Sequence, residues 1–195
     1  GYSDPLINAR MNPAADPFCF DEAVENAMRH EVELARVRRD SVGGRVSCVI
    51  SGVPAGLGNP VFGKAQARLA EAMMSLNAVK AFEYGAGSQV SGAYGSESID
   101  EFAPGFKPFP FTTNHQGGIL GGITSGMSIY FNLHFKPTPT LPRPVNMADA
   151  EGNISEILVG GRHDPCVALR APVIVEALAA LTIADLMLLS HESLV

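Results

Sequence analysis

A strict alternation over residues 127–135 constrains the fold of this chain more than any other feature. Hydrophobic side chains stand at every second position, and mostly polar ones stand between them: Met127, Ile129, Phe131, Leu133 and Phe135 against Ser128, Tyr130, Asn132 and His134. Successive side chains of a β-strand point to opposite faces of its sheet. The segment therefore predicts a strand in a sheet with one buried face.

Weaker patterns predict further elements around this strand. Short β-branched or apolar runs predict strands over residues 46–51 and 79–84. Residues 20–39 favour a helix with Asp21 as its cap, since Glu22 follows in the first turn and arginines stand at the end. We also expect a long loop over residues 85–115 and a polar hairpin after the proline-rich turn at 137–144.

Two more helices are predicted from apolar spacing. From Pro60 onward, apolar residues recur near every fourth position, which indicates a helix with proline at its start: Val61, Ala65, Leu69, Met73 and Leu76. Another helix should begin near Pro172. Its apolar run over residues 173–189 contains Glu176, Thr182 and Asp185, so we interpret it as a buried amphipathic helix and not as a membrane span.

Composition narrows the function classes. The chain has 195 residues, 46% of them hydrophobic and 17% charged, which excludes a disordered chain and suggests one unit over residues 1–195 with apolar surface left for a partner. A net charge of -6 without basic runs argues against nucleic-acid and anionic-membrane binding. Three cysteines without a CxxC pair favour neither a disulfide framework nor a zinc site, so we expect a reducing cytoplasm.

Two segments that flank the strong strand could bind a ligand, and they should lie at its opposite ends. The glycine-rich residues 117–126 would let backbone N–H groups approach a phosphate or a ring system, although their spacing is neither GxGxxG nor GxxxxGK[ST]. A tight glycine turn that packs against a neighbouring helix is the alternative. After the strand, Lys136 with Thr138 and Thr140 could hold a phosphate, or Lys136 could simply be exposed beside a rigid turn.

Residues 162–166 combine several reactive side chains before the last helix. Arg162 could hold an anion and Asp164 could move a proton. Alternatively, Asp164 caps the following helix and Cys166 is a small core residue. No metal site is expected, because the further ligands of a metal hydrolase or a zinc site are missing. Lys136, Arg162 and Arg170 could together form a positive pocket in this acidic chain.

Five segments occur here in the order in which they occur in chorismate synthase: residues 51–58 (SGVPAGLG), 72–80 (AMMSLNAVK), 117–126, 135–140 and 161–166 (GRHDPC). From about Asn12 to its end, the chain resembles the C-terminal half of that enzyme. The resemblance implies an α+β fold in which helices pack between antiparallel sheets, here the C-terminal half of the layered fold. It also implies a homo-oligomer, a tetramer in the family.

The resemblance further implies an activity. Chorismate synthase converts 5-enolpyruvylshikimate 3-phosphate to chorismate and phosphate by anti-1,4-elimination, with reduced FMN and without net redox change, in the shikimate pathway of aromatic amino acid biosynthesis. Asp164 matches the aspartate that relays a proton at the flavin N5. The positions that match the FMN site are Asn77, Ala78, Gly121, Lys136, Pro137, Thr138, Pro139, Thr140 and Arg162. Pro139 replaces a common serine, which removes a hydroxyl and an N–H donor from one contact to the flavin phosphate.

The motifs of the family's N-terminal half, GESHG and GRSSARET, are absent, and with them the two catalytic histidines. We therefore expect the chain alone to be inactive. The alternative function is a non-catalytic flavin-binding or self-associating fragment. The expected location is the cytoplasm, because a plastid location would require a transit peptide that has been removed.

Overall fold

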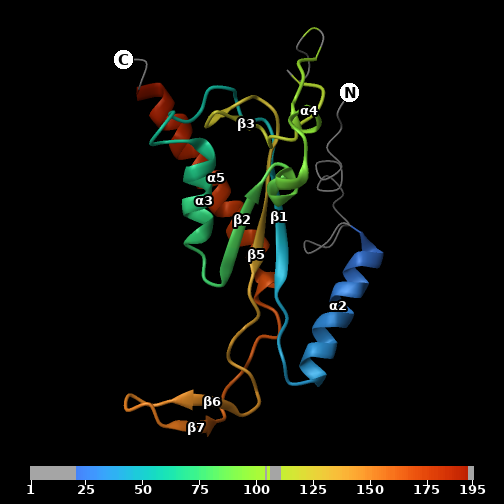
Figure 1. The fold of residues 1–195 in the computed structure, drawn as a ribbon, viewed down its shortest axis with the longest axis vertical. Coiled ribbons are helices and arrows are strands. Elements are labelled where there is room, and N and C mark those ends of the chain that lie inside the picture. Colours follow the sequence, from blue (N-terminus) through green and yellow to red (C-terminus); the bar gives the residue numbers. More distant parts are fainter. Residues whose placement is uncertain (1–20, 104, 106–110, 193–195) are drawn as a thin grey trace.

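The structure is a computed structural model that describes residues 21–103, 105 and 111–192. Its centre is a three-stranded antiparallel sheet in the order β1-β5-β2 (Figure 1). The strands are β1 (Gly44–Ile50), β2 (Val79–Tyr84) and β5 (Ile129–Phe135). All three strands are confirmed, β2 with the predicted bounds. Cys19 and the start of the family resemblance lie outside the described residues.

The alternation along β5 organises this sheet as predicted. Ile129, Phe131 and Leu133 are completely buried on one face. On the other face, Asn132 accepts a hydrogen bond from Ser47 of β1 (Oγ to Oδ1, 2.6 Å), and His134 lies 3.2 Å from Glu83 of β2. The open face is therefore held by polar cross-strand contacts, and the core forms on the other face.

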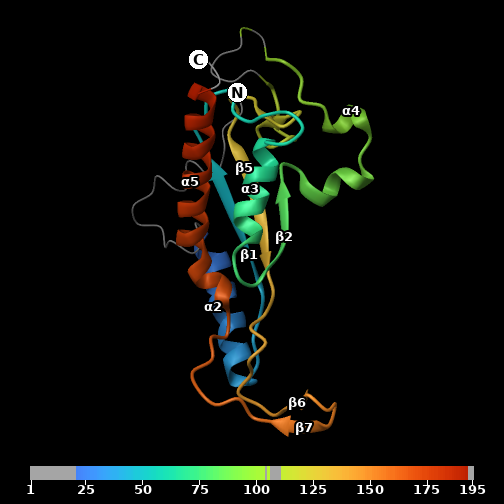
Figure 2. The same ribbon diagram turned by 90° about the vertical axis from the view of Figure 1, so that its left-hand side faces the viewer.

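Two helices cover the buried face of the sheet. Helix α3 (Ala65–Met74) packs against β2, and helix α5 (Ala171–Glu192) packs against β1 and against α3. Figure 2 shows both helices in front of the sheet. Buried side chains at helical spacing make these contacts: Ala65, Leu69 and Met73 from α3, and Val175, Ala179, Ile183 and Leu186 from α5. This helix-on-sheet arrangement is the α+β fold that the sequence predicts.

The predicted helix start at Pro60 is wrong. The backbones of Asn59 and Gly63 bond to each other in both directions (N to O, 2.9 and 3.1 Å), which closes a tight turn around Pro60. Val61 has a φ of +77° in this turn, and its side chain is exposed. Helix α3 begins only at Ala65, so the first residue of the predicted apolar stripe lies outside the helix.

The prediction that residues 173–189 form a buried amphipathic helix is wrong for the outward face of α5. That face is also apolar: the side chains of Val173 and Leu188 are 72% and 67% exposed. By length and composition alone, Val167–Ser190 could cross a membrane, although core helices of soluble proteins meet the same criterion. An apolar helix side of this size needs a covering partner in water.

Two elements lie at the margin of this core, and one of them, α2, contacts the core through Val32. Helix α2 (Glu22–Val37) runs beside the lower end of β1, and Asp21 caps it as predicted by accepting bonds from the N–H groups of Ala23 (2.9 Å) and Val24 (3.1 Å). The predicted hairpin consists of β6 (Val145–Ala148) and β7 (Ile154–Ile157), and it projects from the lower end of the molecule (Figure 1).

Short elements complete the fold at both ends of the sheet. The expected loop over residues 85–115 contains a 3-10 helix, η1 (Gly87–Gly92), and a single turn of helix, α4 (Gly95–Ser98). The glycine-rich segment forms the small hairpin of β3 (Ile119–Leu120) and β4 (Ile123–Thr124). At the other end of the sheet, the 3-10 helix η3 (Val167–Arg170) leads directly into α5.

Candidate functional site

Two of the predicted ligand-binding segments meet at the lower end of the sheet. Residues 136–140 follow β5, residues 162–166 precede η3, and residues 40–44 run between them. Ser41 Oγ donates to the carbonyl of Thr138 (2.7 Å), and the N–H of Val42 donates to the carbonyl of Pro165 (2.8 Å). We call residues 40–44 the linking segment.

A small hollow lies between these segments. It has a volume of about 50 Å³, and its walls come from all three segments and from the end of α2: Arg36, Asp40, Ser41, Thr140, Pro142, His163, Asp164 and Pro165. Thr140 and Asp164, which the sequence nominates separately, therefore face one space. The hollow is too small for a whole flavin, whose sites usually exceed 300 Å³.

Asp164 is held by two arginines and does not cap the next helix. Its Oδ1 accepts from Arg162 Nη1 at 2.6 Å and lies 3.5 Å from Arg170 Nη2. The η3 N-cap is instead Cys166, whose side chain makes no capping bond, so the alternative is wrong for Asp164, whereas Cys166 is a buried core residue as that alternative expected. The aspartate side chain is only 27% exposed, whereas that of Arg162 is 72% exposed. Two guanidinium groups around one carboxylate leave a net positive charge that favours an anion.

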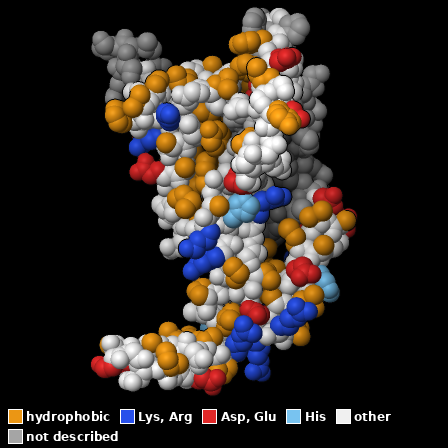
Figure 3. All heavy atoms as spheres, viewed as in Figure 1, with side chains coloured by type: hydrophobic (Ala, Val, Ile, Leu, Met, Phe, Trp, Pro, Cys, Tyr) orange, Lys and Arg blue, Asp and Glu red, His pale blue; other side chains and the backbone are white. Residues whose placement is uncertain are grey.

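The wider surroundings of this cluster are also positive. Basic side chains gather in the lower part of the molecule (Figure 3), although the chain as a whole carries a charge of -6. They come from the end of α2, the starts of β1 and β2, and the segments around the hollow: Arg36, Arg38, Arg39, Arg45, Lys80, Lys136, Arg143, Arg162 and Arg170. The positive region is thus wider than the predicted group of Lys136, Arg162 and Arg170.

Asn77 and Ala78 lie beside the start of the Lys136 segment. The carbonyl of Ala78 accepts the N–H of Lys136 at 2.9 Å. Ala78 has a φ of +71°, a left-handed conformation that costs a residue with a Cβ about 1–2 kcal/mol. Such strain often clusters at ligand sites. The structure therefore brings the three sequence-nominated segments around residues 77, 136 and 162 to one end of the sheet.

Gly121 is not part of this cluster. It lies in the β3–β4 turn, near the start of β5, and the seven residues of β5 separate the two ends of the sheet by about 20 Å. A Cβ on Gly121 would meet nothing within 4 Å, so its backbone is open to a ligand. By contrast, Cβ atoms on Gly117 and Gly118 would stand 2.4 Å from Gly85 N and 2.6 Å from Ser128 O, so these two glycines are closely packed, although against non-helical backbone and not against the helix that the alternative expected.

The histidines near the site have structural partners. His163 Nε2 lies 3.0 Å from the carbonyl of Val159, within its own loop. On the open face of the sheet, the Ser88 hydrogen bond and then the His134 hydrogen bond hold the pKa of Glu83 below its usual value. Among residues 21–103, 105 and 111–192, no cluster of three or more His, Cys, Asp or Glu side chains could hold a metal ion.

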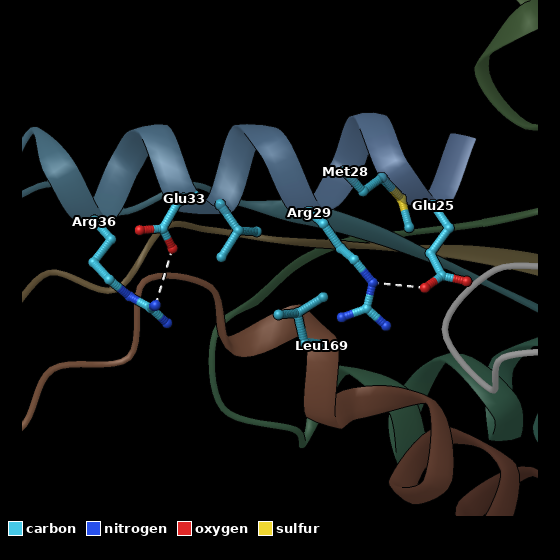
Figure 4. Close-up of a pocket in the computed structure, with 7 residues that line it drawn as sticks. Glu25, Met28, Arg29, Glu33, Arg36 and Leu169 are labelled. Carbon is cyan, nitrogen blue, oxygen red and sulfur yellow. Dashed lines mark hydrogen bonds and ion pairs between the residues drawn. The ribbon is translucent and has the colours of Figure 1, made fainter. Parts of the chain in front are cut away.

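A larger hollow of about 280 Å³ lies between α2 and η3 (Figure 4). Met28 of α2 and Leu169 of η3 contribute its apolar walls, and its charged residues pair along the helix: Glu25 with Arg29 (2.6 Å) and Glu33 with Arg36 (2.9 Å). None of the sequence-nominated site residues lines it. Size alone therefore does not identify the functional site of this chain.

Sequence reasoning missed the linking segment. It gave residues 40–44 no role in a ligand site. The signal that could have found them is an Asp-Ser pair followed closely by two glycines, since short polar side chains and glycines often mark a segment that other backbones approach closely.

Comparison with known proteins supports the family resemblance. A family model described as "Chorismate synthase" matches residues 6–188. The chorismate synthase of Campylobacter hominis is 45% identical over 176 residues, which cover 90% of this chain and 47% of that protein. The chorismate synthase of Lachnoclostridium phytofermentans is 49% identical over 185 residues, covering 93% of this chain and 50% of that protein.

A solved structure gives the same assignment. The crystal structure of a chorismate synthase superposes with a TM-score of 0.68 at 27% identity, and the match covers 85% of this chain and 43% of that chain. The chain thus spans about half the length of the relatives it matches. On the sequence match and the shared fold, the chain belongs to the chorismate synthase family.

Proposed function

We propose that this chain supplies the flavin and phosphate side of a chorismate synthase, which converts 5-enolpyruvylshikimate 3-phosphate to chorismate and phosphate with reduced FMN. One observation carries the proposal. Residues 77–78, 136–140 and 162–164 are far apart in the sequence, yet they surround one positively charged end of the sheet. Both molecules that this reaction needs carry phosphate, and such a surface attracts phosphate.

The residues at this end of the sheet fit a phosphate-bearing flavin. The hydroxyl Oγ1 of Thr138 is buried and has no hydrogen-bond partner among the described residues. An unsatisfied buried hydroxyl costs about 1–3 kcal/mol, so a bound group that bonds to it would stabilise the site. In this proposal residues 136–140 hold the flavin phosphate, and the strained backbone of Asn77 and Ala78 lies against the rest of the cofactor.

Reduced FMN supplies electron density that helps the substrate phosphate leave. The chain itself contributes positive charge and a proton acceptor. Arg162 and Arg170 both hold Oδ1 of Asp164, which fixes the carboxylate and places positive charge beside a departing phosphate. Oδ2 of Asp164 has no hydrogen bond to the described residues, so it can take the proton lost from the substrate ring.

The apolar outer face of α5 bears on assembly. We propose that the remaining half of the family fold, or another copy of the chain, covers Val173, Leu181 and Leu188 in the active protein, a tetramer in this family. Self-association without catalysis is the second candidate function, and the same exposed face favours it. Turnover by a mixture of this chain with an N-terminal half of the family would separate the two, because the catalytic histidines of the family lie outside this chain.

Titration of the chain with FMN tests the proposal. We expect saturable quenching of flavin fluorescence, strengthened by 5-enolpyruvylshikimate 3-phosphate. Arg162→Ala should weaken binding about tenfold or more, since a hydrogen bond to a charged group contributes about 1.5–3 kcal/mol. Arg68→Ala is the matched control: it removes an exposed arginine that pairs with Asp185 (3.0 Å) between α3 and α5, and it should leave binding unchanged.

Two results would count against the proposal. Equal weakening by Arg162→Ala and Arg68→Ala would show a nonspecific charge effect. Absence of binding by a chain that circular dichroism shows to be folded would mean that these residues form no flavin site on their own. Adding the N-terminal half of a related chorismate synthase then asks whether the missing half completes the site.

A further inference from the structure

Hydrogen bonds from the linking segment connect residues 136–140 to residues 162–166, which we call the two anion-binding segments. Among the described residues, no hydrogen bond joins residues 136–140 directly to residues 162–166. Instead, the hydroxyl of Ser41 bonds to the Thr138 carbonyl (2.7 Å), and the N–H of the next residue, Val42, bonds to the Pro165 carbonyl (2.8 Å). Cys166 Sγ also donates to the carbonyl of Gly43 (3.8 Å), so the distance between the two segments depends on three consecutive residues.

Asp40 fixes the conformation of the linking segment at its start. One carboxylate oxygen accepts the N–H of Ser41 (Oδ1, 2.8 Å), and the other lies 3.3 Å from Arg143 Nη2. The N–H of Asp40 bonds to the carbonyl of Ala35 (2.9 Å), which ties it to the end of α2. Ser41 is half-buried, so its hydroxyl bond to Thr138 is partly shielded from water.

The two glycines of the linking segment permit close approach on both sides. A Cβ on Gly43 would stand 2.5 Å from the carbonyl oxygen of Phe135 and 3.3 Å from Pro137 Cδ. A Cβ on Gly44 would stand 2.5 Å from Ala168 Cβ, in η3. Any larger residue at these positions would push the strand end or η3 away from the linking segment.

We propose that Ser41 and Gly43 are positioning residues, which hold residues 136–140 at the correct distance from Arg162 and Asp164 for one phosphate-bearing ligand. The proposal rests on the proposed function for the identity of that ligand. Neither residue brings a charge to the site. Their effect is to keep Thr140 and the arginine-bound Asp164 on the walls of the same hollow.

The test compares two serines, one in the linking segment and one just after it in β1. Ser41→Ala removes the bond to Thr138. Ser47→Ala removes the bond to Asn132 on the open face of the sheet (2.6 Å). Both remove one hydroxyl bond from an irregular or edge position, so both should lower the melting temperature by less than about 4 °C.

FMN affinity should separate these variants. Ser41→Ala should raise the Kd for FMN about fivefold to tenfold, because one neutral hydrogen bond that orders the site is lost. Ser41→Thr retains the hydroxyl and should restore the Kd to within about twofold, and Ser47→Ala should leave it unchanged. Gly43→Ala should weaken binding more than Ser41→Ala. Equal effects of Ser41→Ala and Ser47→Ala, or no effect of Ser41→Ala, would overturn the proposal.

A measurement without any ligand keeps this test independent of the proposed function. In amide NMR spectra of the chain, Ser41→Ala should shift the resonances of residues 138–140 and also those of residues 163–166. Ser47→Ala should shift neither group. Shifts confined to residues 138–140 would show that the linking segment does not connect the two anion-binding segments. A chain that shows the coupled shifts but binds no FMN would support the positioning role and contradict the flavin assignment.

Discussion

Single residues show where the site strains the backbone. Ala78 adopts a left-handed conformation that glycine adopts without cost, and its carbonyl holds the first residue of the Lys136 segment. Thr138 buries a hydroxyl that no described group satisfies. Both features lower the stability of the free chain, and both lie where the sequence resemblance predicts the cofactor. A strained backbone and an unsatisfied buried group that lower the stability of the free protein are typical of a ligand site.

Replacing Ala78 by glycine tests this strain. Ala78→Gly relieves about 1–2 kcal/mol of left-handed strain and costs about 0.5–1 kcal/mol through the larger entropy of the unfolded chain, so the free energy of unfolding should rise by up to about 1.5 kcal/mol. Urea denaturation of the chain measures it. The control is Ala81→Gly in β2, where glycine should lower the stability by about 0.5–1 kcal/mol. A loss of stability in both variants would contradict the strain at Ala78.

At the scale of elements, side-chain periodicity predicted those strands and helices whose position depends on which of their faces is buried. The alternation along β5 was sufficient to predict the strand and its buried face, because burial of one face of a sheet requires an apolar side chain at every second residue. The start of α3 was not predictable in this way, because the turn at Asn59 and Gly63 depends on backbone bonds that no side-chain pattern shows. The burial of residues 173–189 was predicted wrongly for the outward face of α5. The sequence of a helix does not show whether another layer covers each of its apolar faces.

The candidate site was likewise predictable only in part. Residues 136–140 and 162–164 could be nominated from their chemistry and from the family motifs. Their meeting could not be predicted, because the Ser41–Thr138 bond joins positions 97 residues apart and leaves no local pattern. By contrast, the placement of Gly121 at the far end of β5 from Lys136 was predicted, because the two segments flank the same strand, and the structure confirms it. Residue types show which chemistry is available, and the fold decides which residues share a site.

The β6–β7 hairpin gives an element-scale prediction in pH. Asp149 accepts hydrogen bonds from the Asn153 side chain (2.9 Å) and from the N–H groups of Asn153 (2.8 Å) and Glu151 (3.0 Å). These bonds, and chiefly the one from the Asn153 side chain, hold the pKa of Asp149 below the usual 3.8. The ionised Asp149 side chain therefore stabilises the turn above pH 3.8. This stabilisation is lost as the pH falls through the lowered pKa and the carboxylate is protonated.

NMR of the Asn153 side-chain amide should therefore show a transition with a midpoint below pH 3.8. The Asp149→Asn variant should lack this transition and should show the acid-state resonances already at neutral pH. A transition at or above pH 3.8 in the unsubstituted chain would contradict the hydrogen-bonded turn. The hairpin lies outside the core, so global unfolding should not follow the same curve.

For the whole molecule, the sheet and its two helices form one layered unit whose outer helical side is uncovered. The chain covers about half the length of its relatives, and the open apolar face of α5 is where further layers of the family fold would pack. The positive end of the sheet is formed within this chain, while the catalytic histidines of the family are not. We therefore propose that these residues form one side of a composite active site.

The most direct test mixes this chain with the N-terminal half of the Campylobacter hominis chorismate synthase and measures phosphate release from 5-enolpyruvylshikimate 3-phosphate with reduced FMN. We predict release by the mixture, none by either half, and a loss of about a hundredfold or more with Asp164→Ala, the usual scale for removing a proton-transfer group. Release by the mixture that Asp164→Ala leaves unchanged would contradict the account, as would a stable complex of the two halves that releases no phosphate.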